Sequence, residues 1–557
     1  MIKRICIGGW MLLLVSGIYS CKQYRRNLSH AQVSLESIRE GERLAAVYCG
    51  SCHLLPDPSL LNSKSWEKGV LPQMGPRLGI FNHGFEHYPS NRNDPNLSKG
   101  YYPAEPLLKP EEWEHILDYY TATSPDSLPG QSRPRPIEKG VPMAAGVPLF
   151  EVQTPALRYD MPATSLVRVD KRGLFVFDIH YQKLYRFSAG LEVLDSIRDE
   201  GGIVDMVKQD SEWVVSNIGV LNPTNGKFGK LQVLRERAAG GAADNGVTAF
   251  AADNGIAASA AGSGAAAFAA GGARWALDSV PLATGLERPV QVQAADLNGD
   301  GRVDYLVCEF GNLAGVLSWL ENKGGGQYER HVIRATPGAI RAYVNDYNHD
   351  GLPDVWALFA QGDEGIFLFT NQGKGRFSEQ SVLRFPPSYG SSYFELADFN
   401  KDGKPDIVYT CGDNADFSPV LKPYHGVYIF LNDGHNQFRQ DYFFPINGCY
   451  KAMARDFDGD GDLDLATIAF FPDFNHQPEE GFVYLENIGG GDFKPYSLPQ
   501  TQRGKWLTMD AGDIDGDGRL DIVLGNFSFF APVTKAGIDF KKEASFMVLR
   551  NAGARAR

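Results

Sequence analysis

Short apolar runs that alternate with clusters of Gly, Asp and Asn fill the second part of the chain. Runs such as 305–307 and 522–524 are rich in Val, Ile, Leu and Tyr, and similar runs occur earlier, at 174–177 and 213–215. Short apolar segments bounded by turn residues are typical of β-strands. The pattern therefore predicts an all-β region over residues 149–550.

The first part of the chain has the spacing of amphipathic helices instead. Residues 40–48 carry apolar side chains at helical intervals, and Pro110 opens a second helix over 111–120. The apolar face of that second helix consists of Trp113, Ile116, Leu117 and Tyr120. We therefore expect a small all-α domain over residues 35–124.

Two segments have neither pattern. Residues 125–148 contain six prolines, which prevent a helix and predict a semi-stiff linker between two domains. Residues 238–273 consist almost entirely of Ala, Gly, Asn, Asp and Ser. We interpret them as a low-complexity insertion between two propeller blades, without a role of its own.

The first helix runs into Cys49-Gly50-Ser51-Cys52-His53, the C-x-x-C-H pattern of c-type haem attachment. Cys49 and Cys52 can reach the two vinyl groups of one porphyrin, and His53 lies where its imidazole can ligate the iron. The alternatives are a thioredoxin-like redox pair, which would follow a buried strand, and half of a zinc site, which needs a second Cys or His pair. The pattern favours a covalent haem c.

The two helices and this motif resemble a class I cytochrome c domain over residues 35–124. The resemblance implies that residues 70–76 form the loop that supplies the sixth ligand of the iron, with Met74 as that ligand. A thioether ligand raises the reduction potential relative to a second His. His83 and His87, in the long segment that follows, are the competing candidates.

A motif of the form D-x-[DN]-x-D-G-x-x-D occurs five times, at intervals of 50 to 58 residues. Side-chain oxygens at positions one, three and five converge as in the first half of an EF-hand loop, Gly at position six allows the sharp turn, and a carboxylate at position nine closes the shell. The flanks are β-like, so we expect calcium-pinned β-hairpins. The predicted ligands are Asp296, Asn298, Asp300, Asp304, Asp346, Asn348, Asp350, Asp354, Asp398, Asn400, Asp402, Asp406, Asp456, Asp458, Asp460, Asp464, Asp513, Asp515, Asp517 and Asp521.

The five copies resemble FG-GAP/VCBS repeats, calcium-loop propellers similar to the integrin α-subunit head, over residues 285–550. Repeats of this length predict one propeller blade each. Residues 149–235 lack the motif but keep short strands, and we interpret them as two degenerate blades. The expected fold is a small all-α cytochrome c domain followed by an all-β, seven-bladed, calcium-binding β-propeller.

The N-terminus has the features of an export signal. Two basic residues precede an apolar run over 5–15 that is short for a membrane span. The residues before Cys21 resemble a bacterial lipobox, which implies a signal peptide over 1–20, a lipid on Cys21 and a tether over 21–34. A plain signal peptide with an incidental Cys is the alternative. Because no Asp follows Cys21, the resemblance favours the outer membrane, with the periplasmic or cell-surface side left open.

Charge and the remaining cysteines add two constraints. The formal net charge of −13 argues against nucleic acid, whose binding requires clustered Lys and Arg. Up to five Ca²⁺ ions would bring that charge to about −3 and relieve repulsion within the motifs. Cys308, Cys411 and Cys449 allow one disulfide and one free thiol, and the sequence does not pair them.

Three functions fit these features. In the first, the haem transfers electrons and the propeller docks a redox partner protein. In the second, the chain is an extracellular binding module or adhesin for a polar glycan or protein. The third is an enzyme, either a haem-linked dehydrogenase or a polysaccharide lyase, but no constellation names a base and we assign no catalytic residue. The enzyme is therefore the weakest of the three. Fold analogy alone favours the binding module, but the haem is the only site with defined chemistry, so we favour electron transfer.

The central face of the propeller is the expected ligand surface, with solvated channel-lining side chains as the alternative. Its polar residues lie just before and just after the motifs: Arg341, Glu395, Lys451, Glu309, Gln361, Asp363, Asp413 and Asn414.

Overall fold

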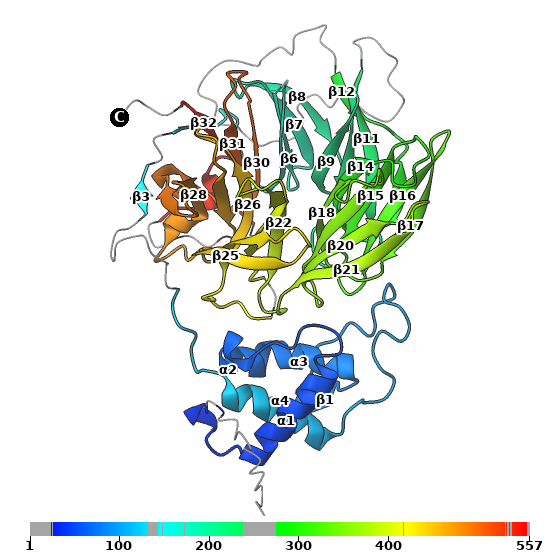
Figure 1. Ribbon diagram of the computed structural model, residues 1–557, viewed down its shortest axis with the longest axis vertical. Helices are drawn as coiled ribbons and strands as arrows, with labels where there is room; N and C mark the ends of the chain where they lie inside the picture. The colour runs from blue at the N-terminus through cyan, green and yellow to red at the C-terminus, as the bar shows by residue number, and fades with distance from the viewer. Residues whose placement is uncertain are drawn as a thin grey trace, which may run out of the picture.

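The computed structural model describes residues 24, 26–131, 143–146, 149–171, 173–237, 274–415, 417–529, 531, 534 and 537–553. A small helical domain lies against a ring of β-sheets (Figure 1). Among the described residues, no helix has both the length and the apolar character needed to cross a membrane. The predicted signal peptide and Cys21 lie outside these residues.

Two long helices frame the helical domain, and both were predicted. Helix α1 (Leu35–Tyr48) begins at Ser34, whose hydroxyl accepts a hydrogen bond from the Ser37 N–H, and α4 (Pro110–Thr123) has Pro110 in its first turn. The shorter elements are η1 (Leu28–His30), η2 (Pro58–Leu60), α2 (Ser63–Ser65), η3 (Trp66–Val70), α3 (Leu71–Met74), η4 (Gly75–Leu78), β1 (Asn82–His83) and β2 (Glu86–His87).

Helices α1 and α4 touch at a glycine. A Cβ atom at Gly41 would overlap the carbonyl oxygen of His115 and would lie 2.7 Å from the Cβ of Tyr119. The missing side chain therefore lets the two backbones approach closely. Around this contact the domain core contains fully buried Trp66, Trp113 and Tyr120.

One prediction for this domain is wrong. Residues 70–76 were expected to form a loop, but they are helical: α3 follows η3 without a break and continues into η4. Pro72 lies in the first turn of α3, where its fixed φ suits a helix. Met74 is the last residue of α3.

Seven antiparallel sheets make the propeller, which confirms the predicted blade count. Blade one contains β5 (Thr164–Asp170), β6 (Gly173–Asp178), β7 (Lys183–Phe187) and β8 (Val193–Arg198); blade two, β9 (Ile203–Gln209), β10 (Glu212–Asn217), β11 (Gly229–Arg237), β12 (Arg274–Leu277) and β13 (Ala283–Leu286); blade three, β14 (Pro289–Ala295), β15 (Asp304–Glu309), β16 (Val316–Gly324) and β17 (Gln327–Arg334).

The remaining blades repeat this order. Blade four contains β18 (Ala339–Asn345), β19 (Asp354–Phe359), β20 (Gly365–Asn371) and β21 (Phe377–Arg384); blade five, β22 (Ser391–Ala397), β23 (Asp406–Cys411), β24 (Gly426–Asn432) and β25 (Phe438–Pro445); blade six, β26 (Cys449–Arg455), β27 (Asp464–Ala469), β28 (Phe482–Asn487) and β29 (Phe493–Ser497); blade seven, β30 (Trp506–Gly512), β31 (Asp521–Asn526) and β32 (Phe546–Asn551). Short helices η5 (Pro478–Gly481), η6 (Pro499–Arg503) and η7 (Phe540–Lys542) lie between strands.

Residues that precede blade one complete blades six and seven. Strand β4 (Phe150–Gln153) pairs antiparallel with β32 and is the outermost strand of blade seven, so the ring closes between segments far apart in the sequence. Strand β3 (Ala144–Ala145) pairs parallel with β29. The predicted linker 125–148 therefore ends within the propeller rather than before it.

The low-complexity segment 238–273 was expected to lie between two blades, and this prediction is wrong. The residues on either side of it, Arg237 and Arg274, pair with each other in strands β11 and β12 of blade two. The segment therefore connects two neighbouring strands of one sheet.

Apolar clusters between neighbouring blades form the propeller core. Cys308, Cys411 and Cys449 are buried in it as free thiols, so none of them forms the disulfide that the sequence allowed. Burial raises the pKa of each thiol, which keeps these side chains protonated and unreactive.

Candidate functional site

The C-x-x-C-H motif begins where α1 ends. Cys49 is the C-cap residue of the helix, and its N–H donates to the carbonyl oxygen of Ala45 at 2.9 Å. Its side chain packs against the core of the helical domain, and burial, followed by the nearby Cys52, raises the pKa of its thiol to about 12. Cys52 is exposed. The helix thus presents one thiol at the core and one at the surface.

His53 has one ring nitrogen engaged and one available. Its Nδ1 lies 3.0 Å from the carbonyl oxygen of Leu54, so Nδ1 must donate, which leaves Nε2 with its lone pair. Burial lowers the pKa of His53. A neutral imidazole with a fixed tautomer is the form that ligates a metal.

Met74 packs on the same apolar core as Cys49, whereas the competing histidines lie on the surface hairpin and have polar partners. His83 Nε2 lies 2.7 Å from a carboxylate oxygen of Glu114, and His87 Nδ1 lies 2.8 Å from the side-chain oxygen of Asn82. Two thiols, an imidazole with a free Nε2 and a thioether are the donor types that suit a c-type haem, and two of them, Cys49 and Met74, pack on one apolar core.

The helical domain rests on the propeller face that carries the loops between second and third strands. Tyr424 donates its hydroxyl to the carbonyl oxygen of Leu60 at 3.0 Å, and the Asn225 side chain donates to Asp94 at 2.8 Å. Val420 packs against the core of the helical domain. Helices α2 and α3 lie on the side nearest the propeller (Figure 1).

Charged side chains of the propeller act on His53 electrostatically. Asp363 forms ion pairs with Arg384 and, at 2.7 Å, with Arg334. Asp363 raises the pKa of His53 and Arg384 lowers it, both less strongly than burial does. Charges of the propeller therefore reach the C-x-x-C-H motif.

The five acidic motifs are loops between the first and second strands of blades three to seven, on the face opposite the helical domain. In each loop the N–H of the position-six glycine donates to the carboxylate at position one, at 2.8 to 3.1 Å. These glycines have positive φ angles, from 80° at Gly403 to 93° at Gly461, which confirms that position six needs glycine.

Carboxylates converge most closely in the last two loops. Side-chain oxygens of positions one, three and five lie within 4.8 Å of one another, in the groups Asp456, Asp458, Asp460 and Asp513, Asp515, Asp517. Hard oxygen ligands at this spacing suit Ca²⁺. The other three loops have Asn at position three and carry one carboxylate fewer.

Position nine has a second role that the sequence analysis missed. In all five loops this Asp is buried, and one of its carboxylate oxygens accepts the N–H of an Asn at the end of the third strand, at 2.8 Å. The Asn residues are Asn322, Asn371, Asn432, Asn487 and Asn551. Each begins an N-x-G sequence, a repeated signal that would have identified them.

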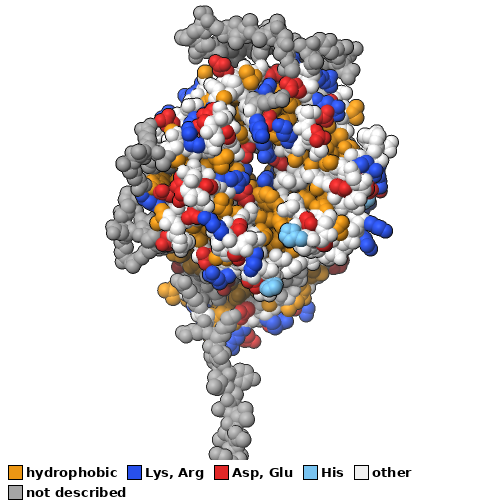
Figure 2. All heavy atoms as spheres, turned by 45° about the horizontal axis from the view of Figure 1, so that its top comes forward, with side chains coloured by type: hydrophobic (Ala, Val, Ile, Leu, Met, Phe, Trp, Pro, Cys, Tyr) orange, Lys and Arg blue, Asp and Glu red, His pale blue; other side chains and the backbone are white. Residues whose placement is uncertain are grey.

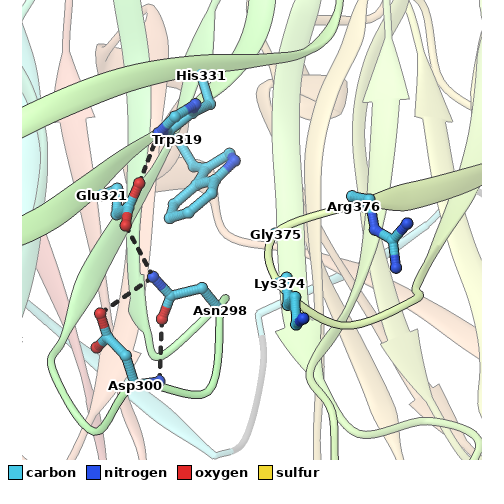
Figure 3. A pocket seen from close by; sticks show the side chains of 8 residues that line it. All are labelled: Asn298, Asp300, Trp319, Glu321, His331, Lys374, Gly375 and Arg376. Carbon is cyan, nitrogen blue, oxygen red and sulfur yellow. Dashed lines mark hydrogen bonds and ion pairs between the residues drawn. The ribbon is translucent and has the colours of Figure 1, made fainter.

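Loop one also borders a pocket of about 480 Å³. Figure 3 shows a chain of side chains along one wall, from His331 through Glu321 and Asn298 to Asp300. Trp319 stacks on the ring of His331, and Gly375 of blade four lies opposite. No sequence pattern distinguished Trp319, Glu321 or His331.

The predicted central-face residues belong to separate regions. Arg341, Glu395 and Lys451 lie on the innermost strands β18, β22 and β26. Glu309 is fully buried in an ion pair with Arg330, and burial raises its pKa to about 7. Gln361, Asp363, Asp413 and Asn414 lie in loops on the face that carries the helical domain.

Comparison with known proteins identifies the repeats. Residues 296–357 and 346–409 match the FG-GAP-like repeat. The chain is 29% identical over 185 residues to cartilage acidic protein 1 of Mus musculus (30% of this chain, 26% of that protein) and 28% identical over 261 residues to its Homo sapiens counterpart (42% and 37%). It is 33% identical over 122 residues to integrin alpha-PS3 of Drosophila melanogaster (18% and 11%).

The matches thus span well under half of the length of these relatives. Among solved structures, the N-terminal domain of Nup159 (TM-score 0.38, 9% identity, 73% of this chain and 97% of that one) and Saccharomyces cerevisiae Sqt1 (TM-score 0.40, 9% identity, 71% and 98%) show weak likeness. The strand order establishes the blade count independently of them. The chain therefore contains a seven-bladed β-propeller with FG-GAP-like repeats, and over part of its length it is similar to integrin alpha-PS3 and cartilage acidic protein 1.

Proposed function

We propose that this protein is an exported lipoprotein that transfers electrons through a c-type haem attached to Cys49 and Cys52, with the propeller as the docking platform for its redox partner. The observation that carries this proposal is the position of the motif at the end of α1, with Met74 on the same apolar core and the propeller alongside. A haem in this place supplies one-electron redox chemistry.

The residues of the chain have separate roles in this proposal. Cys49 and Cys52 hold the porphyrin, His53 offers Nε2 to the iron because Leu54 engages Nδ1, and Met74 is the sixth ligand. Arg384 and Asp363 place fixed charges beside His53. Charges near a haem shift its reduction potential. The contact between the helical domain and the propeller therefore adjusts the reduction potential of the haem.

Optical spectra of the oxidised and reduced full-length protein, matured with a haem-attachment system, test the proposal. We expect a low-spin c-type spectrum that changes in Met74→Ala and stays unchanged in the matched variants His83→Ala and His87→Ala. A spectrum that responds to one of the histidines instead would reassign the sixth ligand. Absence of covalent haem from the wild type would refute electron transfer.

We propose that the five loops bind calcium, up to five ions in all. The convergent carboxylates of loops four and five support this, because without a cation three like charges within 4.8 Å repel one another. Equilibrium dialysis measures the number of ions bound. Asp460→Ala and Asp517→Ala, which remove a ligand oxygen altogether, should each remove about one ion, whereas Asp462→Asn, at the half-buried position seven of loop four, should remove none.

The lipid on Cys21 is also part of the proposal, and it places the protein at the outer membrane. Expression of Cys21→Ser beside the wild type tests it: the wild type should sediment with the membrane fraction and the variant should be released in soluble form. Equal partitioning of the two would contradict a lipid anchor.

A binding module or adhesin for a polar glycan or protein is the second candidate function. The similarity to integrin α and cartilage acidic protein 1 over the repeats favours it, although a shared fold does not establish a shared ligand. Binding to a glycan array that does not depend on the oxidation state of the haem would support this function over electron transfer.

A further inference from the structure

The innermost strands bring two cations to equivalent positions around the channel. Strands β18, β22 and β26 each pair with the next strand of their blade and shift register near the start. Arg341, Tyr393 and Lys451 are the first paired residues after the shift in blades four, five and six. The three side chains therefore lie at one level of the ring.

The aromatic ring of Tyr393 lies between the two cations. The Arg341 guanidinium carbon is 5.2 Å from the ring centroid and the Lys451 Nζ is 5.0 Å from it. Each contact is within the range of a cation–π interaction. The two positive groups are thus held around one neutral ring, one from each neighbouring blade.

Neither cation has a carboxylate partner among the residues that the structure describes. Arg341 Nε donates to the hydroxyl of Tyr343 at 3.2 Å, and Lys451 Nζ donates to the carbonyl oxygen of Met509 at 2.7 Å. Both acceptors are neutral. Charges buried in a protein are ordinarily paired, so this pair of cations calls for an anion.

The nearby carboxylates form their hydrogen bonds with groups other than Arg341 and Lys451. Glu395 accepts hydrogen bonds from Arg455 at 2.8 Å and from the Ala454 N–H at 2.9 Å. Asp205 pairs with Arg168 at 2.5 Å. Asp510 accepts the N–H of Val169 at 2.8 Å. These three acids face four cations of the channel, Arg168, Arg341, Lys451 and Arg455, and one positive charge is left over.

We propose that Arg341 and Lys451 form a binding site, beside the Tyr393 ring in the central channel, for the oxyanion group of a small molecule, such as a carboxylate. Both side chains keep partial exposure. Figure 2 shows Lys and Arg side chains gathered around a hollow at the centre of the face opposite the helical domain. The planar guanidinium and the point charge of the ammonium together suit an oxyanion.

Electrostatics supports this assignment. Burial, and after it the positive charge of Arg341, lowers the pKa of Lys451 to about 8. A bound anion relieves both effects, because it neutralises the repulsion and replaces the lost hydration with charge-assisted hydrogen bonds. The inference is independent of the haem and of the calcium loops.

Isothermal titration calorimetry of the calcium-loaded full chain with sodium acetate and with sodium sulfate, at constant ionic strength set by NaCl, tests the proposal. Arg341→Gln and Lys451→Gln should each weaken binding by about 10- to 100-fold, the loss expected for one charge-assisted hydrogen bond. Lys451→Arg should retain binding. Lys494→Gln, which removes an exposed cation from the outer strand of the same blade, should bind like the wild type.

The two anions distinguish the chemistry of the ligand: tighter binding of acetate assigns a carboxylate, and tighter binding of sulfate assigns a tetrahedral oxyanion. If Arg341→Gln does not fold, the pair Lys451→Gln and Lys451→Arg decides the outcome. Failure of the wild type to bind either anion saturably, or equal affinities in the wild type and Lys451→Gln, would overturn the proposal.

Discussion

Substitution of Asn371 tests how the side chain of this N-x-G residue holds blades three and four together. The side chain is buried, and its Nδ2 donates to the carbonyl oxygens of Leu297 in blade three, at 2.9 Å, and of Pro353 in blade four, at 3.0 Å. Its Oδ1 accepts the Gly373 N–H at 2.9 Å. One amide thus joins two blades and closes the turn that follows its own strand.

The loss in the free energy of unfolding caused by Asn371→Ala can be estimated from these contacts. Three hydrogen bonds at about 1 kcal/mol each are lost, and the buried carbonyl oxygen of Leu297 is left without this donor, which adds about 1 kcal/mol or more. We expect the free energy of unfolding to fall by about 3–4 kcal/mol. Asn371→Asp should cost at least as much, because it places an oxygen against two carbonyl oxygens.

Urea unfolding at saturating calcium, followed by fluorescence of the propeller tryptophans, measures this loss. Gln372→Ala, an exposed neighbour in the same turn, is the matched control and should change the free energy of unfolding by less than about 0.5 kcal/mol. A loss below about 1 kcal/mol in Asn371→Ala would show that water or a shifted backbone replaces the amide, and the reasoning would fail.

Three further predictions follow from other parts of the molecule. Gly41→Ala should raise the hydrogen-exchange rates of α1 and α4, because the added Cβ forces the helices apart; unchanged rates would contradict the close contact. Chelation of calcium should unfold the propeller before the haem spectrum changes, and simultaneous loss of both signals would refute separate domains. Burial raises the pKa of Glu364 to about 8, so this carboxyl should make stability decrease from about pH 4.5 to about pH 8, by at most about 1.4 kcal/mol per pH unit; Glu364→Gln should make the slope in pH-dependent urea titrations shallower, and an unchanged slope would contradict the raised pKa.

The sequence was sufficient for features that a local pattern encodes. The spacing of the five motifs predicted blades, and the apolar faces of 40–48 and 111–120 predicted the two long helices. Gly at position six identified the turns, because few other residues adopt positive φ there. The metal-binding chemistry of the motifs could also be predicted, because ligands that are close in sequence are close in space.

Features that depend on distant pairing could not be predicted. Strand β4 has four residues, too few for a period, and its partner β32 lies at the other end of the ring. The contact between Tyr424 and Leu60 joins two domains through a backbone carbonyl, which has no sequence signature. The register shifts that align Arg341 with Lys451 are likewise visible only once the strands are paired.

Closure of the ring by β4 sets an order of events during synthesis. Phe150 pairs with Asn551, so β4 leaves the ribosome roughly 400 residues before its partner. At about 5–20 residues per second, this interval is about 20–80 s. The helical domain, whose core comes from residues up to 122 apart from Val420, is complete long before then. The nascent propeller, in contrast, keeps an unpaired strand edge throughout that interval, and chaperones that protect such edges are the factors on which its yield should depend.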